Sequence, residues 1–265
     1  MKLDIKVYMN GHEIFYDQVE SIEYERNKHV LHEMKALGAS VKNNGQDLSD
    51  SEIDALSQTD ARRVNVATRS QYSASELENL YHDKIALSDQ MWKDINKDFK
   101  MGDPMKAGVT EFEVHGVDPQ VLAQGLSPDA AANGNAETEY ETNPEHFIMT
   151  GHGDNGLHVM ETFGMYGEPT NMFVNVVKEG DLNINLPIKR EPDYPILSVG
   201  NPVLASDGSE INNIPFHQFK PLPDGIKIKG AIFVPKAAPD EIVSGHQWHL
   251  AIESWEQMRL LEKNS

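Results

Sequence analysis

Near the C-terminus, a histidine and a glutamate four residues apart are the first candidates for chemistry. His249 and Glu253 belong to a segment, 246–255, that also contains His246 and two tryptophans. A separation of four residues on a helix places both side chains on one face, one turn apart. An imidazole nitrogen and a carboxylate oxygen can there bind one Zn²⁺ at about 2 Å. An exposed ion pair is the simpler interpretation, but the adjoining apolar face indicates a buried helix, in which a carboxylate needs a partner. We therefore predict a metal site on this helix.

A second group of candidate ligands surrounds a glycine-rich turn within residues 150–161. Glycine flanks His152 on both sides, so the backbone can turn tightly and present the ring. A strand is predicted over 157–163, where Glu161 shares a face with a valine and points away from His158. A surface hairpin with an outward-facing Glu161 is the alternative. A cupin site is not supported, because cupins need two histidines separated by one residue, and His152 and His158 are six apart.

A third candidate, His217, precedes a Pro-Asp-Gly turn at residues 223–225. If this segment is a strand, the His217 side chain alternates with those of Phe216 and Gln218. The near-neutral pKa of a histidine suits proton transfer. A single histidine on a strand is, however, more often structural or solvent-facing, and both interpretations stay open.

The composition narrows the classes of function. The 265 residues include 39% hydrophobic residues, enough for a sizeable core, and 23 Lys and Arg against 42 Asp and Glu give a net charge of -19. Such a surface repels phosphate backbones and anionic lipid, so nucleic-acid and membrane-surface partners are not expected. The absence of cysteine excludes disulfides, thiolate metal sites and cysteine catalysis. No signal-like or 18-residue apolar run occurs, so we expect a soluble cytoplasmic protein.

The elements that must position these residues fall into two regions. Residues 1–104 are predicted to be mainly helical after a short strand, with helices over 19–37, over 51–56 and from Ser75, in a capping box, to about residue 95. Residues 105–265 are predicted to contain strands and to end in a helix over 239–263. The strands are expected at 110–114, 146–150, 157–163, 172–177, 182–187 and 226–234. Residues 127–143 are interpreted as a loop.

Strands followed by one long helix indicate an α+β domain. We expect the helix-grip arrangement, in which a curved antiparallel sheet wraps a C-terminal helix and a cavity lies between them. The N-terminal region is then expected to cover that cavity or to form a homodimer.

Taken in order along the chain, the candidate residues resemble the pattern of the diacetylphloroglucinol hydrolase family. The pattern consists of His152-x-x-Asn155, then Glu161, then His217 ahead of the turn, then His249-x-x-x-Glu253. That family contains zinc-dependent carbon–carbon bond hydrolases with a helix-grip fold and an added helical N-terminal region, and the resemblance covers about residues 105–263. It implies four zinc ligands: His152, Glu161, His249 and Glu253. It implies three catalytic residues: Asn155 to orient an acyl oxygen, His217 as a proton-transfer or positioning group, and His146 as the nearest polar replacement for a tyrosine expected shortly before the first ligand.

The resemblance therefore leads us to expect a zinc-dependent hydrolase that cleaves a carbon–carbon bond next to a carbonyl. The acidic surface favours a neutral or weakly acidic substrate, such as an acylated phenol or a β-diketone. A carrier of an apolar ligand, without metal, is the alternative from another class. A metal-dependent lyase or isomerase on the same scaffold is a third hypothesis.

Overall fold

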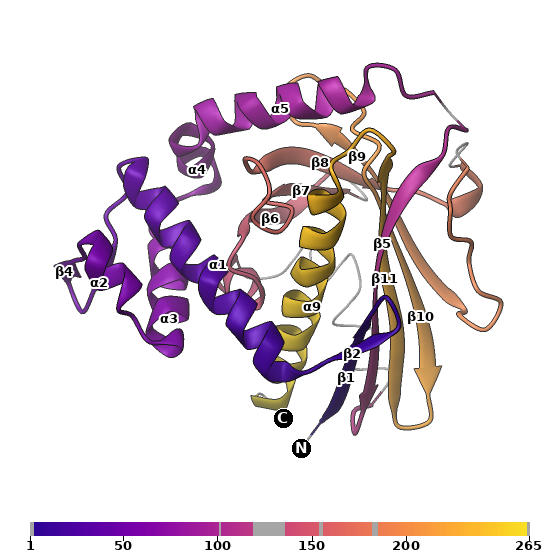
Figure 1. Ribbon diagram of the computed structural model, residues 1–265, viewed down its shortest axis with the longest axis horizontal. Coiled ribbons are helices and arrows are strands. Elements are labelled where there is room, and N and C mark those ends of the chain that lie inside the picture. The colour runs from indigo at the N-terminus through magenta and orange to yellow at the C-terminus, as the bar shows by residue number, and fades with distance from the viewer. Residues whose placement is uncertain (1–2, 101, 119–135, 154–155, 182–184, 264–265) are drawn as a thin grey trace.

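The computed structural model of the protein is built on one nine-stranded antiparallel sheet (Figure 1). It describes residues 3–100, 102–118, 136–153, 156–181 and 185–263. The order of the strands across the sheet is β2-β1-β5-β11-β10-β9-β8-β7-β6. The strands of this sheet are β1 (Asp4–Met9), β2 (His12–Ile14), β5 (Met105–His115), β6 (His146–His152), β7 (Gly156–Glu161), β8 (Thr170–Val176), β9 (Ile196–Leu204), β10 (Ile214–Leu222) and β11 (Gly225–Pro235). A two-stranded ribbon, β3 (Lys42–Asn43) with β4 (Gln46–Asp47), lies outside it.

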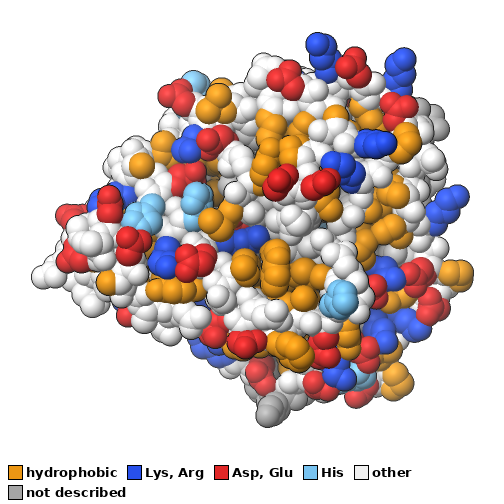
Figure 2. Space-filling view, in the orientation of Figure 1, with side chains coloured by type: hydrophobic (Ala, Val, Ile, Leu, Met, Phe, Trp, Pro, Cys, Tyr) orange, Lys and Arg blue, Asp and Glu red, His pale blue; other side chains and the backbone are white. Residues whose placement is uncertain are grey.

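Most helices of the described residues lie between β2 and β5, with one helix between β5 and β6 and one after β11. The helices are α1 (Tyr16–Ala36), α2 (Asp50–Asp54), α3 (Gln58–Arg69), α4 (Ala74–Leu80), α5 (His82–Asn96), α8 (Ala136–Thr142) and α9 (Asp240–Lys263), with a short 3₁₀ turn η1 (Glu179–Asp181). No helix in the described part of the chain is both long enough and apolar enough to cross a membrane. Figure 2 shows acidic and basic side chains interspersed with apolar ones on one face of the molecule.

The helix-grip prediction is wrong, although a large antiparallel sheet and a long C-terminal helix are both present. The sheet does not curl around α9. The first residues of the chain also extend the sheet: β1 pairs with β5 from Asp4 opposite His115 to Met9 opposite Thr110, and β2 pairs with β1. Residues 4–14 therefore belong to the same sheet as the strands that follow residue 104.

Helix α9 covers only part of the sheet. Its residues Leu250, Ile252 and Met258 pack in one core cluster with buried side chains of β1, β5 and β11. At the other end of the sheet, Phe147 and Met160 of β6 and β7 pack instead against α1 and α4. Helices of the first region therefore cover the part of the sheet that α9 does not cover.

Alternation along β7 follows the sequence pattern. Glu161 and Val159 border the cavity described below, whereas His158 on the opposite face hydrogen-bonds the Asn171 side chain through Nε2 at 2.8 Å. Of the other expected strands, the one over 182–187 is wrong where it is described, since 185–187 form no strand. Strands β9 and β10 were not predicted, because Pro and Gly interrupt the apolar runs on which such a prediction depends.

Helix prediction succeeded in outline and failed in detail. Helix α1 ends at Ala36, and Gly38 follows in a left-handed conformation (φ 99°). The helix expected from Ser75 is two helices, α4 and α5, separated at Tyr81, and its capping box is formed by Ser73 with Glu76. Helix α3 was missed, and α8 lies inside the segment that was interpreted as a loop.

A contact between two glycines sets the distance between β7 and α9. Gly164 follows β7 with φ 69°, and a Cβ at this position would lie 2.1 Å from the carbonyl oxygen of Gly245. A Cβ on Gly245 would in turn lie 2.5 Å from the carbonyl oxygen of Phe163. Only glycine allows both backbones to approach this closely. The contact brings the end of β7 next to the middle of α9, where the candidate ligands lie.

Candidate metal centre

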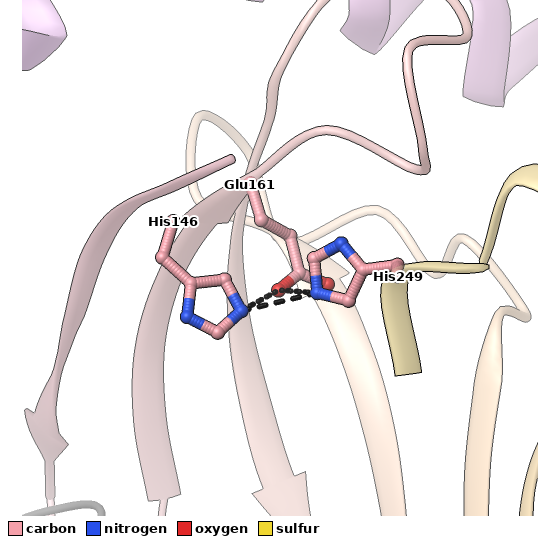
Figure 3. Close-up of side chains that lie close together, drawn as sticks. All are labelled: His146, Glu161 and His249. Carbon is pink, nitrogen blue, oxygen red and sulfur yellow. Dashed lines mark hydrogen bonds and ion pairs between the residues drawn. The ribbon is translucent and has the colours of Figure 1, made fainter. Parts of the chain in front are cut away.

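Three ligand-type side chains converge where β6 begins, β7 ends and α9 passes (Figure 3). His146 is the first residue of β6, Glu161 the last residue of β7, and His249 lies in the middle of α9. The two Nε2 atoms are 3.0 Å apart, and Glu161 Oε2 is 3.7 Å from each of them. Within the described residues, this is the only group of three such side chains whose ligand atoms all lie within 4.8 Å of one another.

The spacing of these atoms fits a single ion. Ligand atoms at about 2.05 Å from one tetrahedral Zn²⁺ lie roughly 3.3 Å from each other. The three distances lie on both sides of that value. The group could therefore hold a metal ion with only small movements of side chains.

Burying these three side chains costs free energy unless a cation compensates for their lost hydration. His146 and His249 are each 1% exposed and Glu161 is 7% exposed. Burial raises the pKa of Glu161, and burial next to His249 lowers the pKa of His146 well below its usual value. Burial alone would lower the pKa of His249 as well, but the Glu161 and Glu145 carboxylates outweigh it and the pKa is raised. A metal ion would supply the positive charge that these groups otherwise take from protons.

Glu253 is close to this group but is not one of the three. It lies one helical turn after His249 and borders the same cavity. Burial, partly offset by the charge of His249, raises its pKa to about 7. Its Oε1 accepts a hydrogen bond from Gln257 Nε2 at 3.2 Å. The prediction that His249 and Glu253 share one face of a buried helix agrees with this arrangement.

The predicted ligand His152 is elsewhere. It is the last residue of β6, it is exposed, and its ring stacks on Phe173 with centroids 3.9 Å apart. In the convergent group its place is taken by His146, for which the resemblance had implied a catalytic role. A register irregularity between His146 and Ile148 shifts the strand at this point, so simple alternation from His152 does not describe His146. Asn155 lies outside the described residues.

A cavity of about 210 Å³ opens from the group along the sheet. Its walls are mainly apolar side chains: Met149, Leu157, Val159, Met172, Val174, Val199, Ile232 and Leu250. His217, His246 and Asn213 add polar atoms, and the buried Asn213 Oδ1 and His246 Nδ1 atoms have no hydrogen-bond partner among the described residues. Burial lowers the pKa of His217 to about 4, so its imidazole is uncharged at neutral pH. The site is thus an apolar pocket with a few polar groups and the ligand cluster at one end.

Sequence reasoning did not place His146 among the convergent ligand-type residues, and it did not single out Glu145 beside it. The only signal in the sequence was the segment Asn143-Pro144-Glu145-His146, in which two potential ligands directly follow a proline. Four residues selected from the sequence do border the cavity: Glu161, His217, His249 and Glu253.

Comparison with known proteins adds little to the geometry. No family model matches the sequence, and no curated protein matches it. The chain is similar to a protein from Rhodobacter sphaeroides of known crystal structure, with 16% identity and a TM-score of 0.34. That likeness covers 62% of this chain and 100% of the other.

Proposed function

We propose that the protein binds a zinc ion through His146, Glu161 and His249, with Glu253 as the fourth ligand. The observation that carries this proposal is the set of interatomic distances among His146, Glu161 and His249, which lie on both sides of the value expected between ligands of one tetrahedral ion. Two imidazoles and two carboxylates are donors that zinc accepts readily, and they give a nearly neutral centre. Burial of both imidazoles supports the same assignment, because a charged and hydrogen-bonding cluster in the core needs a compensating ion.

We further propose that the centre belongs to a hydrolase that cleaves a carbon–carbon bond next to a carbonyl, in an acylated phenol or a β-diketone. The proposal combines the resemblance to the diacetylphloroglucinol hydrolase family with the form of the cavity. Apolar walls beside a metal-ligand cluster suit a neutral molecule that has an apolar body and a reactive carbonyl. The cavity volume of about 210 Å³ restricts the part of the substrate that it encloses to a small molecule.

In the proposed reaction, one water molecule supplies a hydroxide to the acyl carbon and a proton to the leaving carbon. Hydroxide adds to the acyl carbon, the carbon–carbon bond breaks with its electron pair going to the leaving carbon, and that carbon receives a proton. A bound zinc ion would polarise the carbonyl and lower the pKa of water towards about 7. His217 is uncharged before the reaction, because its pKa is about 4. It must therefore accept a proton first and then pass it to the leaving carbon.

Elemental analysis combined with a substrate screen tests the proposal. We expect about one zinc per chain after incubation with zinc and desalting, and release of a carboxylic acid from members of a panel of acylated phenols and β-diketones. His249→Ala should lose both the zinc and the activity, while His152→Ala should keep both. A wild-type chain that folds but does not retain zinc would overturn the metal assignment.

The carrier hypothesis is separated by the same experiment. A carrier would bind an apolar ligand in this cavity with equal affinity in the presence and absence of a chelator, and would release no product. Ligand binding that survives both chelation and His249→Ala would support the carrier and count against the hydrolase.

A further inference from the structure

Glu145, which the proposed reaction does not use, lies fully buried directly before the candidate ligand His146. Its Oε2 atom is 3.6 Å from Nδ1 of His249 and 3.0 Å from Nη1 of Arg26. Its Oε1 atom accepts a hydrogen bond from the backbone N–H of Met165 at 2.7 Å. A carboxylate with no exposed surface is thus shared between an imidazole and a guanidinium.

The position of Glu145 determines which nitrogen of His249 can bind a metal. Nδ1 faces the Glu145 carboxylate, and Nε2 faces His146 and Glu161. At 3.6 Å the two atoms are beyond hydrogen-bond distance, but the negative carboxylate attracts a proton on Nδ1 and so favours the tautomer that carries it there. That tautomer leaves the Nε2 lone pair free and directed at the centre of the group, which is the arrangement of a metal-binding histidine with an outer carboxylate.

The guanidinium of Arg26, on α1, offsets the free-energy cost of burying the Glu145 carboxylate. The Arg26 side chain is 3% exposed, pairs with Glu145, and donates from Nη2 to the carbonyl oxygen of Gly245 at 3.0 Å. Gly245 lies one helical turn before His249 on α9. One arginine from the first region of the chain therefore contacts both the outer carboxylate and the helix that carries the ligand.

A second buried arginine, Arg69, hydrogen-bonds the backbone of residues 140–146, the segment that contains Glu145 and His146. Arg69 of α3 donates to the carbonyl oxygens of Tyr140 at 2.8 Å, of Asn143 at 2.9 Å, and of His146. Asn143 in turn donates from Nδ2 to the carbonyl oxygen of His249 at 3.2 Å and accepts from the backbone N–H of Glu145. The backbone at residues 140–146 is thus fixed by the N-terminal helices on one side and by α9 on the other.

From these contacts we infer that Glu145 is a positioning residue of the metal centre, and that Arg26 holds it in place from α1. The affinity of the centre for metal then depends on the N-terminal helical region, which supplies no ligand itself. The inference rests on the proposed metal binding. It extends that proposal by assigning the second layer of the centre and a role for the first region of the chain.

Metal affinity of the apo protein, measured by competition with a zinc chelator, tests the inference. We expect Glu145→Gln to weaken zinc binding about 10- to 100-fold, the effect typical of removing an outer-layer partner of a metal-binding histidine. Glu168→Gln is the matched control, because Glu168 also pairs with a basic side chain, Lys84, away from the centre. It should leave the dissociation constant unchanged.

A spectroscopic measurement separates positioning from general stability. The visible absorption bands of the Co²⁺-loaded protein should shift in Glu145→Gln and stay unchanged in Glu168→Gln, since only the first alters the orientation of His249. Arg26→Lys keeps the charge but loses the forked geometry, so it should weaken zinc binding by a smaller factor and provides a second variant if Glu145→Gln does not fold.

The outcomes distinguish this inference from the proposed function. If the wild-type chain binds no zinc or Co²⁺, the metal assignment itself is wrong. If the wild type binds zinc but Glu145→Gln and Arg26→Lys bind it equally tightly, with unshifted Co²⁺ bands, Glu145 has no positioning role. Weaker binding with shifted bands in a variant whose apo form melts near the wild-type temperature supports the inference.

Discussion

His146 and His152 begin and end the same strand, β6, and they lie in opposite environments. His146 is buried at the meeting point of β7 and α9, with Arg69 of α3 bound to its carbonyl oxygen. His152 is exposed and contacts mainly one aromatic ring, that of Phe173. The flanking glycines that made His152 a candidate indicate an accessible ring, but a ligand also requires other donors that converge on it. The comparison shows that local accessibility is a poor guide to which histidine joins a buried group of ligand-type side chains.

Replacing each of these histidines in turn gives the largest expected difference. His146→Ala removes one of three convergent donors, and we expect zinc affinity to fall by more than about 100-fold, above the loss caused by an outer-layer change. His152→Ala should leave zinc affinity unchanged. Chelator competition on the two purified variants measures both values. Equal losses would mean that the two ends of β6 are not distinct in the way described here.

The buried end of the strand should also be the more sensitive to loss of an arginine. Arg69→Met leaves three buried carbonyl groups without this donor, at roughly 1–3 kcal/mol each, so we expect the free energy of unfolding to fall by at least about 3 kcal/mol. Arg63 on the same helix forms an exposed ion pair with Asp60, and Arg63→Met should change stability by less than about 1 kcal/mol. Urea denaturation of both variants checks the contrast. A smaller loss for Arg69→Met than for Arg63→Met would show that the hydrogen bonds from Arg69 to residues 140–146 do not stabilise the fold.

The pH dependence of the apo protein sharpens the comparison further. Burial raises the pKa of Glu253 from 4.5 to about 7, so the folded state holds this proton more tightly than the unfolded state. This contribution to stability is present below pH 4.5 and is lost as the pH rises to about 7. We expect Glu253→Gln to flatten the dependence over that window, as measured by urea denaturation of metal-free protein at several pH values. His152→Ala, at the exposed end of β6, is the control and should leave the slope unchanged.

Zinc binding should have the opposite dependence on pH. Protons on Glu253, and on Glu161 and His249, whose pKa values are raised, must leave before these groups bind a metal. The apparent affinity should therefore increase between pH 6 and pH 8, with proton release on binding that isothermal calorimetry in two buffers can count. Affinity that is constant over this range would contradict a site built from these residues.

The smallest expected effect concerns the exposed end of β6. The His152 ring stacks on Phe173, and an exposed aromatic stack contributes only about 0.5–1 kcal/mol. His152→Ala should lower the free energy of unfolding by no more than that amount, as measured by thermal or urea denaturation. A loss of several kcal/mol would mean that His152 has a structural role beyond this contact.

Local periodicity was enough to predict some of the site. The four-residue step from His249 to Glu253 places both on one face of α9, and alternation along β7 turns Glu161 towards the cavity. Both follow from backbone geometry over a few residues, and the long C-terminal helix and most of the strands follow in the same way.

Only the tertiary structure decided which histidine joins Glu161 and His249. His146 and His249 meet across 103 positions of sequence, and Arg26 reaches Glu145 from the first helix. Such meetings depend on strand pairing, on the irregularity in β6 and on the glycine contact between Gly164 and Gly245. The same kind of long-range pairing added β1 and β2 to the sheet. Local periodicity carries no information about which distant elements pack together, because packing is decided by the energy of the whole fold.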